Sequence, residues 1–475
     1  MPEPRKPVSP WPFIALAVVA VAAYLALSAN VEDADPRPMG TVADIATIAE
    51  RDDVNLLFIL VDTLRSDRLG AYGYERDTSP LFDHLAKHGL RFDRHLAQSS
   101  WTKASMASLW TSLYPTRAGV TRFNDLLSTE AVMPAERLRD AGFVTAAIWR
   151  NGWVSGYFGF DQGFDVYHRP VPEPAAGRVE RQNPTLSIAG TDMAAVLSAE
   201  DFLRVHQNDR WFLYMHLMDV HEYTYDEDSA KFGTSYSDVY DNSILRTNIV
   251  LDRLYRFLAD AGQLDNTLIV MTSDHGEAFG ERGFEGHARK VYRETTEVPW
   301  IVSFPFKLEE GLVVEARTRN VDTWPTVLDL LGHPIDSFED LDGFSRMPEI
   351  LAAAQGLPTG GENEEDPGLT VAHLDQTWGQ RDQEPRPTVA VLEGPLRYVQ
   401  SSEPDGQLIE QLFDRSEDEA ELVDLFADRP EEAARLRDEA EGYLAAEPPW
   451  GSDTRKLDLN EIQLNQLRAL GYQLP

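Results

Sequence analysis

A near-continuous apolar run at residues 54–61, which ends at Asp62, constrains the fold of this chain more than any other feature. A run without polar alternation is typical of a strand that is buried on both faces of a parallel sheet. Comparable runs follow at residues 144–149, 211–218, 268–272 and 300–304. Helical patterns lie between them, at residues 79–88, 105–113 and 247–261. This alternation predicts an α/β fold with a mainly parallel central sheet flanked by helices.

The length of the chain predicts more than one structural unit. Its 475 residues exceed the roughly 250–300 residues at which a single hydrophobic core stops growing. Near Gln355 the composition changes, and short strand-like pieces and one acidic helix follow, at residues 388–392, 396–400, 408–413 and 431–444. We therefore predict a catalytic domain over residues 52–355 and a smaller α+β subdomain over residues 356–475.

The N-terminal region predicts a membrane anchor. Residues 11–28 are uncharged and apolar, which is near the lower length limit for a spanning helix. Arg5 and Lys6 precede this run and acidic residues follow it, so the positive-inside rule places residues 1–10 in the cytoplasm and exports the rest. We expect an anchor at residues 11–29, a linker at 30–51, and a catalytic domain in the periplasm or outside the cell. A signal peptide cleaved near residues 27–29 is the alternative.

Charge and cysteine content exclude several classes of protein. The chain has 43 Lys and Arg against 79 Asp and Glu, a net charge of −36, which argues against nucleic acid as a main partner. The absence of cysteine excludes disulfides, thiolate nucleophiles and cysteine-ligated metals. We make no prediction of oligomeric state.

Polar residues follow the ends of two predicted strands. Asp62 ends one, and Asp274 and His275 end another. Functional groups in such folds gather at the carboxyl ends of strands, and two buried carboxylates that converge there require a cation. Carboxylates with imidazole suit Mn²⁺, Mg²⁺ or Zn²⁺. For each residue alone a structural role is the stronger explanation, because an aspartate at a strand end often caps the next helix, but the residues taken together favour a metal site.

A hydroxyl-rich segment, residues 99–109, comes directly before or within a predicted helix. The positive end of a helix dipole stabilises an alkoxide or a bound oxyanion, so a hydroxyl here suits a nucleophile. A plain N-cap at Thr102 or Ser105 fits the same residues. The segment does not by itself choose between the two.

Taken together, ordered motifs resemble those of the sulfatase family, within the alkaline phosphatase superfamily, over about residues 52–475. They are FILVDTLRSDRLGAYGY at 58–74, WTKASMASLWTSLYP at 101–115, MDVH at 218–221, TSDHGE at 272–277, GHARKVY at 286–292 with VP at 298–299, DTWPTVLDLLG at 322–332 and LRALGY at 467–472. The resemblance implies an alkaline phosphatase-like fold.

Departures from the family pattern indicate which branch the chain resembles. Thr102 stands where sulfatases carry the cysteine or serine that becomes formylglycine, and Ala104 and Met106 replace the proline and arginine of that motif. Thr63 replaces the second acidic ligand, so the usual calcium site is incomplete. A formylglycine sulfatase is therefore excluded. The pattern resembles the phosphotransferase branch that includes lipoteichoic acid synthases, in which a threonine is both nucleophile and metal ligand.

That resemblance implies one divalent metal, manganese first, with zinc, calcium or magnesium as alternatives. The implied metal ligands are Asp62, Thr102, Asp274 and His275. The predicted catalytic residues are Thr102, His221 and His287, since histidine titrates near neutral pH. The predicted substrate-binding residues are Lys103, Arg150, Asn151, Arg289 and Lys290. A second metal at Asp219, His221 and His287 is a weaker alternative, and His216 is interpreted as a core histidine.

These features predict a membrane-anchored, metal-dependent hydrolase or phosphotransferase that cleaves phosphodiester or phosphonate esters through Thr102. A phosphate- or sulfate-ester substrate carried on a lipid or an envelope glycan suits the anchor. Two alternatives stay open. One is a sulfuric ester hydrolase that acts without formylglycine, and the other is a degenerate member that serves as an envelope scaffold or binding protein.

Overall fold

The computed structural model describes residues 35–170, 191–334, 340–359, 369–380, 382–451 and 456. The predicted anchor at 11–29 and the closing motif at 467–472 lie outside these residues. Within the described ranges, no helix is both long and apolar enough to cross a membrane.

An eight-stranded sheet forms the centre of the molecule, and it is mainly parallel as predicted. In spatial order its strands are β10 (Leu312–Arg319), β2 (Leu90–Leu96), β9 (Glu297–Ser303), β6 (Thr267–Thr272), β1 (Asn55–Val61), β5 (Trp211–Leu217), β3 (Val144–Trp149) and β4 (Val166–His168). Strand β9 runs antiparallel to both of its neighbours, β2 and β6. The central strand β1 is buried along its whole length, which explains its unbroken apolar run.

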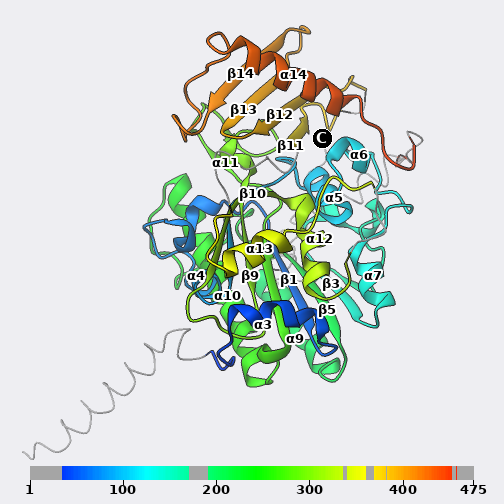
Figure 1. Cartoon of the computed structure of the whole chain (residues 1–475), viewed down its shortest axis with the longest axis vertical. Helices are drawn as coiled ribbons and strands as arrows, with labels where there is room; N and C mark the ends of the chain where they lie inside the picture. Colours follow the sequence, from blue (N-terminus) through cyan, green and yellow to red (C-terminus); the bar gives the residue numbers. More distant parts are fainter. Residues whose placement is uncertain are drawn as a thin grey trace, which may run out of the picture.

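Helices cover both faces of this sheet. Successive side chains of β1 point to opposite faces, so Leu56, Phe58 and Leu60 join one hydrophobic cluster while Leu57 and Ile59 join the other. The first cluster contains α5 (Thr102–Thr111), α7 (Pro134–Asp140) and α12 (Asn320–Leu330). The second contains α4 (Pro80–Lys87), α9 (Asp192–Val205) and α10 (Tyr236–Asp260). Figure 1 shows these layers.

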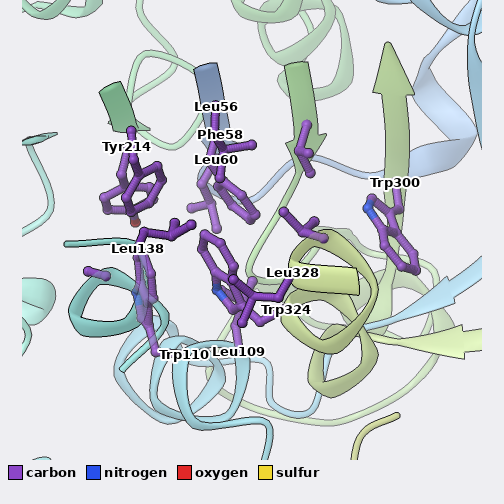
Figure 2. Packing of buried hydrophobic residues seen from close by; sticks show 14 of the residues in the cluster. Leu56, Phe58, Leu60, Leu109, Trp110, Leu138, Tyr214, Trp300, Trp324 and Leu328 are labelled. Carbon is purple, nitrogen blue, oxygen red and sulfur yellow. The ribbon is translucent and has the colours of Figure 1, made fainter. Parts of the chain in front are cut away.

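Aromatic rings fix α5 and α12 against the sheet. Phe58 of β1 stacks on Trp324 of α12 with ring centroids 4.8 Å apart, and Trp110 of α5 stacks on Trp324 at 5.0 Å. Figure 2 shows these rings together between strand and helices. Because α5 begins at Thr102, this packing also fixes where its first residue lies.

The remaining elements are short. The helices are α3 (Val42–Thr47), α6 (Pro115–Ala118), α11 (Arg293–Thr296) and α13 (Met347–Ala354), and the 3₁₀ turns are η1 (Ile48–Glu50), η2 (Ser66–Arg68), η3 (Gly70–Tyr72), η4 (Gly152–Val154), η5 (Gly156–Phe158) and η6 (Leu264–Asn266). Strands β7 (Ala278–Phe279) and β8 (Glu285–Gly286) form a small hairpin. Asp35, Arg37 and Ile45 are buried, so residues 35–50 of the predicted linker pack on the domain.

A second, antiparallel sheet forms the C-terminal unit. Its strands are β11 (Thr370–Asp375), β12 (Pro387–Glu393), β13 (Leu396–Ser402) and β14 (Leu408–Asp414), and helix α14 (Pro430–Leu444) packs on one face. The other face packs against Trp101, Ala104 and the segment around Val291 in the large domain. Figure 1 shows this unit at the top of the molecule, above α5 and α11. It therefore covers the residue that directly precedes Thr102.

Candidate functional site

The polar residues that the sequence singled out come together at the carboxyl edge of the large sheet. Asp62 directly follows β1, and Asp274 comes two residues after β6. Asn151 follows β3, and Thr102 is the first residue of α5. All four are buried, with at most 4% of their surface exposed. Parallel strands bring their carboxyl ends to one edge, which explains why residues far apart in the chain meet here.

The Thr102 hydroxyl lies between two nitrogen atoms. Its Oγ1 is 3.2 Å from Nε2 of His275 and accepts a hydrogen bond of 3.3 Å from Nδ2 of Asn151. The same amide of Asn151 donates to Oδ2 of Asp62 at 2.6 Å. As the first residue of α5, Thr102 also lies where unpaired helix N–H groups favour negative charge. The position suits a hydroxyl that becomes an anion.

Two buried carboxylates face the same space. Oδ1 of Asp62 and Oδ2 of Asp274 are buried without a hydrogen-bond partner. Burial raises the pKa of Asp62, but the neighbouring His221, His216 and His275 outweigh burial and hold it well below its usual range. Burial and the charge of Asp62 raise the pKa of Asp274 well above its usual range. One of the two carboxylates is thus poorly stabilised as an anion in the protein alone.

This donor set fits a divalent cation. His275 Nε2 lies 3.2 Å from Oδ2 of Asp274 and 3.9 Å from Oδ1 of Asp62, the two oxygens that have no other partner. Burial, together with His287, lowers the pKa of His275 to about 3, so its imidazole is neutral and available as a ligand. Within the described ranges, Asp62, His216 and Asp274 form the one group of acidic and histidine residues close enough to hold a metal.

Three histidine rings line one side of this cluster. The His275 ring stacks on that of His287 with centroids 4.6 Å apart, and the His221 ring lies 4.9 Å from that of His287. His287 Nδ1 lies 3.0 Å from Oε2 of the buried Glu277. Burial lowers the pKa of His287, but this carboxylate outweighs burial and raises it, whereas burial lowers the pKa of His221. His287 is therefore the better proton donor of the two near neutral pH.

The comparison with known proteins identifies the family. The sulfatase family model matches residues 54–333, which is more than half of the chain. The chain belongs to the sulfatase family. It is 24% identical to mouse steryl-sulfatase over 465 residues, covering 75% of this chain and 71% of that protein. It is 26% identical to human arylsulfatase A over 351 residues, covering 63% and 68%.

Solved structures show the same fold. The phosphonate monoester hydrolase of Agrobacterium radiobacter superposes with a TM-score of 0.63 at 21% identity, covering 82% of this chain and 95% of that one. A structure of Ps i-CgsB in complex with k-i-k-neocarrahexaose gives a TM-score of 0.65 at 18% identity, covering 88% and 98%. Like its relatives in the sulfatase family, the protein is a hydrolase, and the sequence-based assignment to this family is confirmed.

Some residues that the sequence predicted as substrate contacts have other partners in this sulfatase-family protein. The Arg150 guanidinium is buried between Asp192, Asp219 and Glu222, at 2.5, 2.6 and 2.5 Å. Lys103 donates through Nζ to the backbone carbonyls of Phe123 and Asp125 and lies 3.8 Å from the centre of the Phe158 ring. Both cations are therefore engaged within the protein.

The remaining predicted substrate-binding residues, Asn151, Arg289 and Lys290, differ in their burial and in their distance along the chain from the site residues. Asn151 lies at the centre of the site, as described above. Arg289 is exposed and Lys290 half-buried in the loop that carries His287, and the charge of Arg289 partly opposes the rise in the pKa of that histidine. A second metal at Asp219, His221 and His287 would need the Asp219 carboxylate as a ligand. One oxygen of that carboxylate is already paired with the Arg150 guanidinium. In the described structure these three residues form no metal-competent group.

Sequence reasoning missed two residues of the site. His216 was interpreted as a core histidine; it is fully buried, but its Nε2 lies 3.0 Å from Oδ2 of Asp62. Leu60 pairs with His216 across β1 and β5, so His216 points to the same face as Asp62, but the strand register that shows this is not visible in one sequence. Glu277 is the last residue of the TSDHGE motif, and its position two residues after His275 was the signal that could have placed it in the site.

Proposed function

We propose that this sulfatase-family protein is a metal-dependent hydrolase or phosphotransferase that cleaves phosphodiester or phosphonate esters through Thr102. The observation that carries the proposal is the position of the Thr102 hydroxyl. It begins a helix, lies between His275 and Asn151, and adjoins two carboxylates with unpartnered oxygens. A threonine cannot be converted to formylglycine, so an unmodified hydroxyl is the nucleophile that this site offers.

The residues present support a two-step displacement. Thr102 Oγ1 loses its proton to solvent and forms a bond to phosphorus while the bond to the leaving oxygen breaks. His287, held by Glu277, protonates the leaving oxygen. Water, or the hydroxyl of an acceptor, then gives its proton to His287 and attacks phosphorus, which still carries the remaining substituent of the substrate. The bond to Thr102 Oγ1 breaks, and this oxygen regains a proton from solvent. Asn151 donates to the hydroxyl throughout and holds it in line.

A divalent ion bound by Asp62, Thr102, Asp274 and His275 would lower the pKa of the threonine hydroxyl and offset charge on the phosphoryl oxygens. The unpartnered carboxylate oxygens and the neutral imidazole fit such an ion. Oxygen donors with one imidazole suit Mn²⁺, Mg²⁺ or Zn²⁺. The resemblance to the phosphotransferase branch puts Mn²⁺ first, with Zn²⁺, Mg²⁺ or Ca²⁺ as alternatives.

The charges around the site favour a singly charged reacting group. The buried cations next to Asn151 and Thr102 in the chain, Arg150 and Lys103, are held by carboxylates and backbone carbonyls. Phosphodiesters and phosphonate monoesters carry one negative charge at the reacting centre, whereas a phosphate monoester carries about two near neutral pH. The structural likeness to a phosphonate monoester hydrolase supports the same class.

Sulfate esters are the second candidate substrate, because the named relatives include steryl-sulfatase and arylsulfatase A and because a sulfate monoester also carries a single charge. A scaffold without activity is disfavoured. Loss of catalysis removes the selection that keeps buried, unpartnered carboxylates, yet Asp62 and Asp274 both remain.

We further propose that residues 11–29 anchor the protein and that the site faces the periplasm or the cell exterior, toward lipid-linked or envelope esters. The apolar run and the flanking charges support this. Asp35 and Arg37 are buried, so the packed domain begins a few residues after the proposed anchor.

The test uses the full chain in detergent, with metal content measured by elemental analysis. Hydrolysis is assayed on aryl phosphodiester, phosphonate monoester, phosphate monoester and sulfate ester. The proposal expects about one bound metal per chain, phosphodiester or phosphonate turnover, and loss of turnover with retained metal in Thr102→Ala. Preferential sulfate turnover supports the second candidate, and no metal with no turnover supports a scaffold.

A further inference from the structure

His216 belongs to the metal-competent group that it forms with Asp62 and Asp274, and its two ring nitrogens contact two different side chains. Its Nε2 is 3.0 Å from Oδ2 of Asp62, and its Nδ1 is 2.8 Å from the hydroxyl of Tyr214. All three residues are buried, with at most 1% of their surface exposed. Tyr214 and His216 both belong to β5, and Asp62 follows the neighbouring strand β1. The pairing of these two strands fixes the positions of all three side chains.

The protonation of Tyr214 determines which nitrogen of His216 carries the proton in this series of contacts. Burial raises the pKa of Tyr214 well above its usual range, so the hydroxyl keeps its proton. In the described structure its hydrogen bond is to Nδ1 of His216. An imidazole that accepts at Nδ1 carries its own proton on Nε2. His216 therefore donates from Nε2 to Asp62, and this nitrogen has no lone pair to offer a metal.

Each carboxylate of the site has one oxygen that accepts hydrogen bonds and one oxygen that has no hydrogen-bond partner. Oδ2 of Asp62 receives both His216 Nε2 and Asn151 Nδ2, while Oδ1 has no partner. Oδ1 of Asp274 receives the backbone N–H of Thr63 at 3.2 Å, while Oδ2 has no partner. The two open oxygens are the ones that lie near His275.

We infer that His216 is a positioning residue rather than a ligand. Oriented by Tyr214, it holds Asp62 so that the carboxylate offers a metal only Oδ1. This inference rests on the metal dependence in the proposed function. It has a consequence for metal choice, because Ca²⁺ takes six to eight oxygens and often uses both oxygens of a carboxylate. Because the Asp62 carboxylate can offer only one oxygen, the site favours Mn²⁺ or Zn²⁺ over Ca²⁺.

The chain offers a matched control for this pair. His373 is a buried histidine whose Nδ1 lies 2.8 Å from the hydroxyl of the buried Tyr443, in the C-terminal unit. The substitution His373→Gln removes the same kind of histidine–tyrosine contact outside the described site. Any effect common to both sites reports on folding rather than on the metal.

The experiment measures dissociation constants for Mn²⁺, Zn²⁺ and Ca²⁺ on the full chain by equilibrium dialysis. We expect His216→Leu to weaken Mn²⁺ binding by about 10–100-fold, the usual effect of removing a group that orients a metal ligand. His216→Gln keeps an N–H donor and should retain most of the affinity, and Tyr214→Phe should fall between the two. The preference for Mn²⁺ over Ca²⁺ should shrink in His216→Leu, and His373→Gln should bind like the wild type.

X-ray absorption of the zinc-loaded wild type counts imidazole ligands directly, and it remains informative if a variant fails to fold. One imidazole, from His275, supports the inference. Two imidazoles in the wild type, or an affinity loss in His216→Gln as large as in His216→Leu, would show that His216 is a ligand and overturn it. Turnover by Thr102→Ala would instead contradict the proposed function and leave this result standing.

Discussion

Replacing Arg150 with methionine is expected to destabilise the fold strongly. The guanidinium contacts Asp192, Asp219 and Glu222, and its side chain is 2% exposed. The Asp192 and Asp219 side chains are fully buried, whereas Glu222 is 40% exposed. Methionine keeps most of the volume, so the substitution removes the positive charge with little change in packing.

The magnitude follows from the two buried partners. Removing one member of a buried ion pair costs roughly 3–5 kcal/mol, because the other charge stays buried without compensation. Glu222 adds little, since a partly exposed pair is worth about 0–1 kcal/mol. Asp192 keeps hydrogen bonds from the N–H groups of Met218 and Asp219. We therefore attribute the expected loss of about 3–5 kcal/mol in unfolding free energy mainly to Asp219, whose buried carboxylate loses its cation.

The loss should depend on pH, with a sign set by Asp219. Burial and the charge of Asp192 raise the pKa of Asp219 to about 7, against an ordinary value of 3.8. The folded state thus holds this proton more tightly, and its contribution to stability falls as pH rises between these values. Without Arg150 the pKa of Asp219 rises further. The variant is therefore weakest above about pH 7 and recovers part of its loss near pH 5.

Urea unfolding followed by tryptophan fluorescence measures the effect at both pH values. The control is Arg204→Met, because Arg204 is 53% exposed and pairs with the exposed Asp201 and with Glu200, which is buried but keeps its ion pair with Arg253. We expect less than about 1 kcal/mol from the control. Adding Asp219→Asn to Arg150→Met should restore part of the stability. A loss in Arg150→Met no larger than in the control, or one that does not change with pH, would refute the reasoning.

Four further outcomes follow from the structure. Asn151→Ala, which loses the amide that donates to both Thr102 and Asp62, should lower kcat by roughly 10–100-fold even when assayed at saturating metal. In EDTA, Asp274→Asn should raise Tm above that of the wild type, because it removes a buried carboxyl group beside the charged Asp62. Added metal should raise the Tm of the wild type more than that of the variant. Arg282→Ala loses the bond to the carbonyl of Ala420 in the C-terminal unit, so the loop that carries His287 should become more sensitive to limited proteolysis and kcat should fall. Because the net charge is −36, turnover of anionic substrates at low concentration should rise with moderate salt, and a steep fall would contradict this.

Much of the large sheet was predictable because its strands are continuous apolar runs. The strand predicted at residues 144–149 has those bounds in the structure, and the others differ by a few residues. Strands β2 and β10 were not predicted, since each mixes charged and apolar residues near an edge of the sheet. Helix α10 begins at Tyr236 rather than at residue 247, because its first turns carry polar residues that weaken the apolar pattern.

The site residues that directly follow strands were predictable from their positions in the chain. The residues whose role depends on contacts with other segments were not. Asp62 and Asp274 follow strands, and the edge at which parallel strands end brings them together. The contacts of Arg150 and Lys103 were not foreseeable, because their partners lie on other segments. The role of His216 depends on the register between β1 and β5. Long-range pairings of this kind are set by tertiary packing.

The most direct test of the account is a search for the phospho-threonine intermediate. The metal-loaded full chain is mixed with an aryl phosphodiester, quenched in acid within the first turnover, and digested for peptide mass spectrometry. A Thr102 nucleophile predicts one phosphoryl group on Thr102, which still carries the ester group of the substrate that did not leave, and no such group in Thr102→Ala. Turnover without a modified Thr102, together with activity in Thr102→Ala, would contradict it.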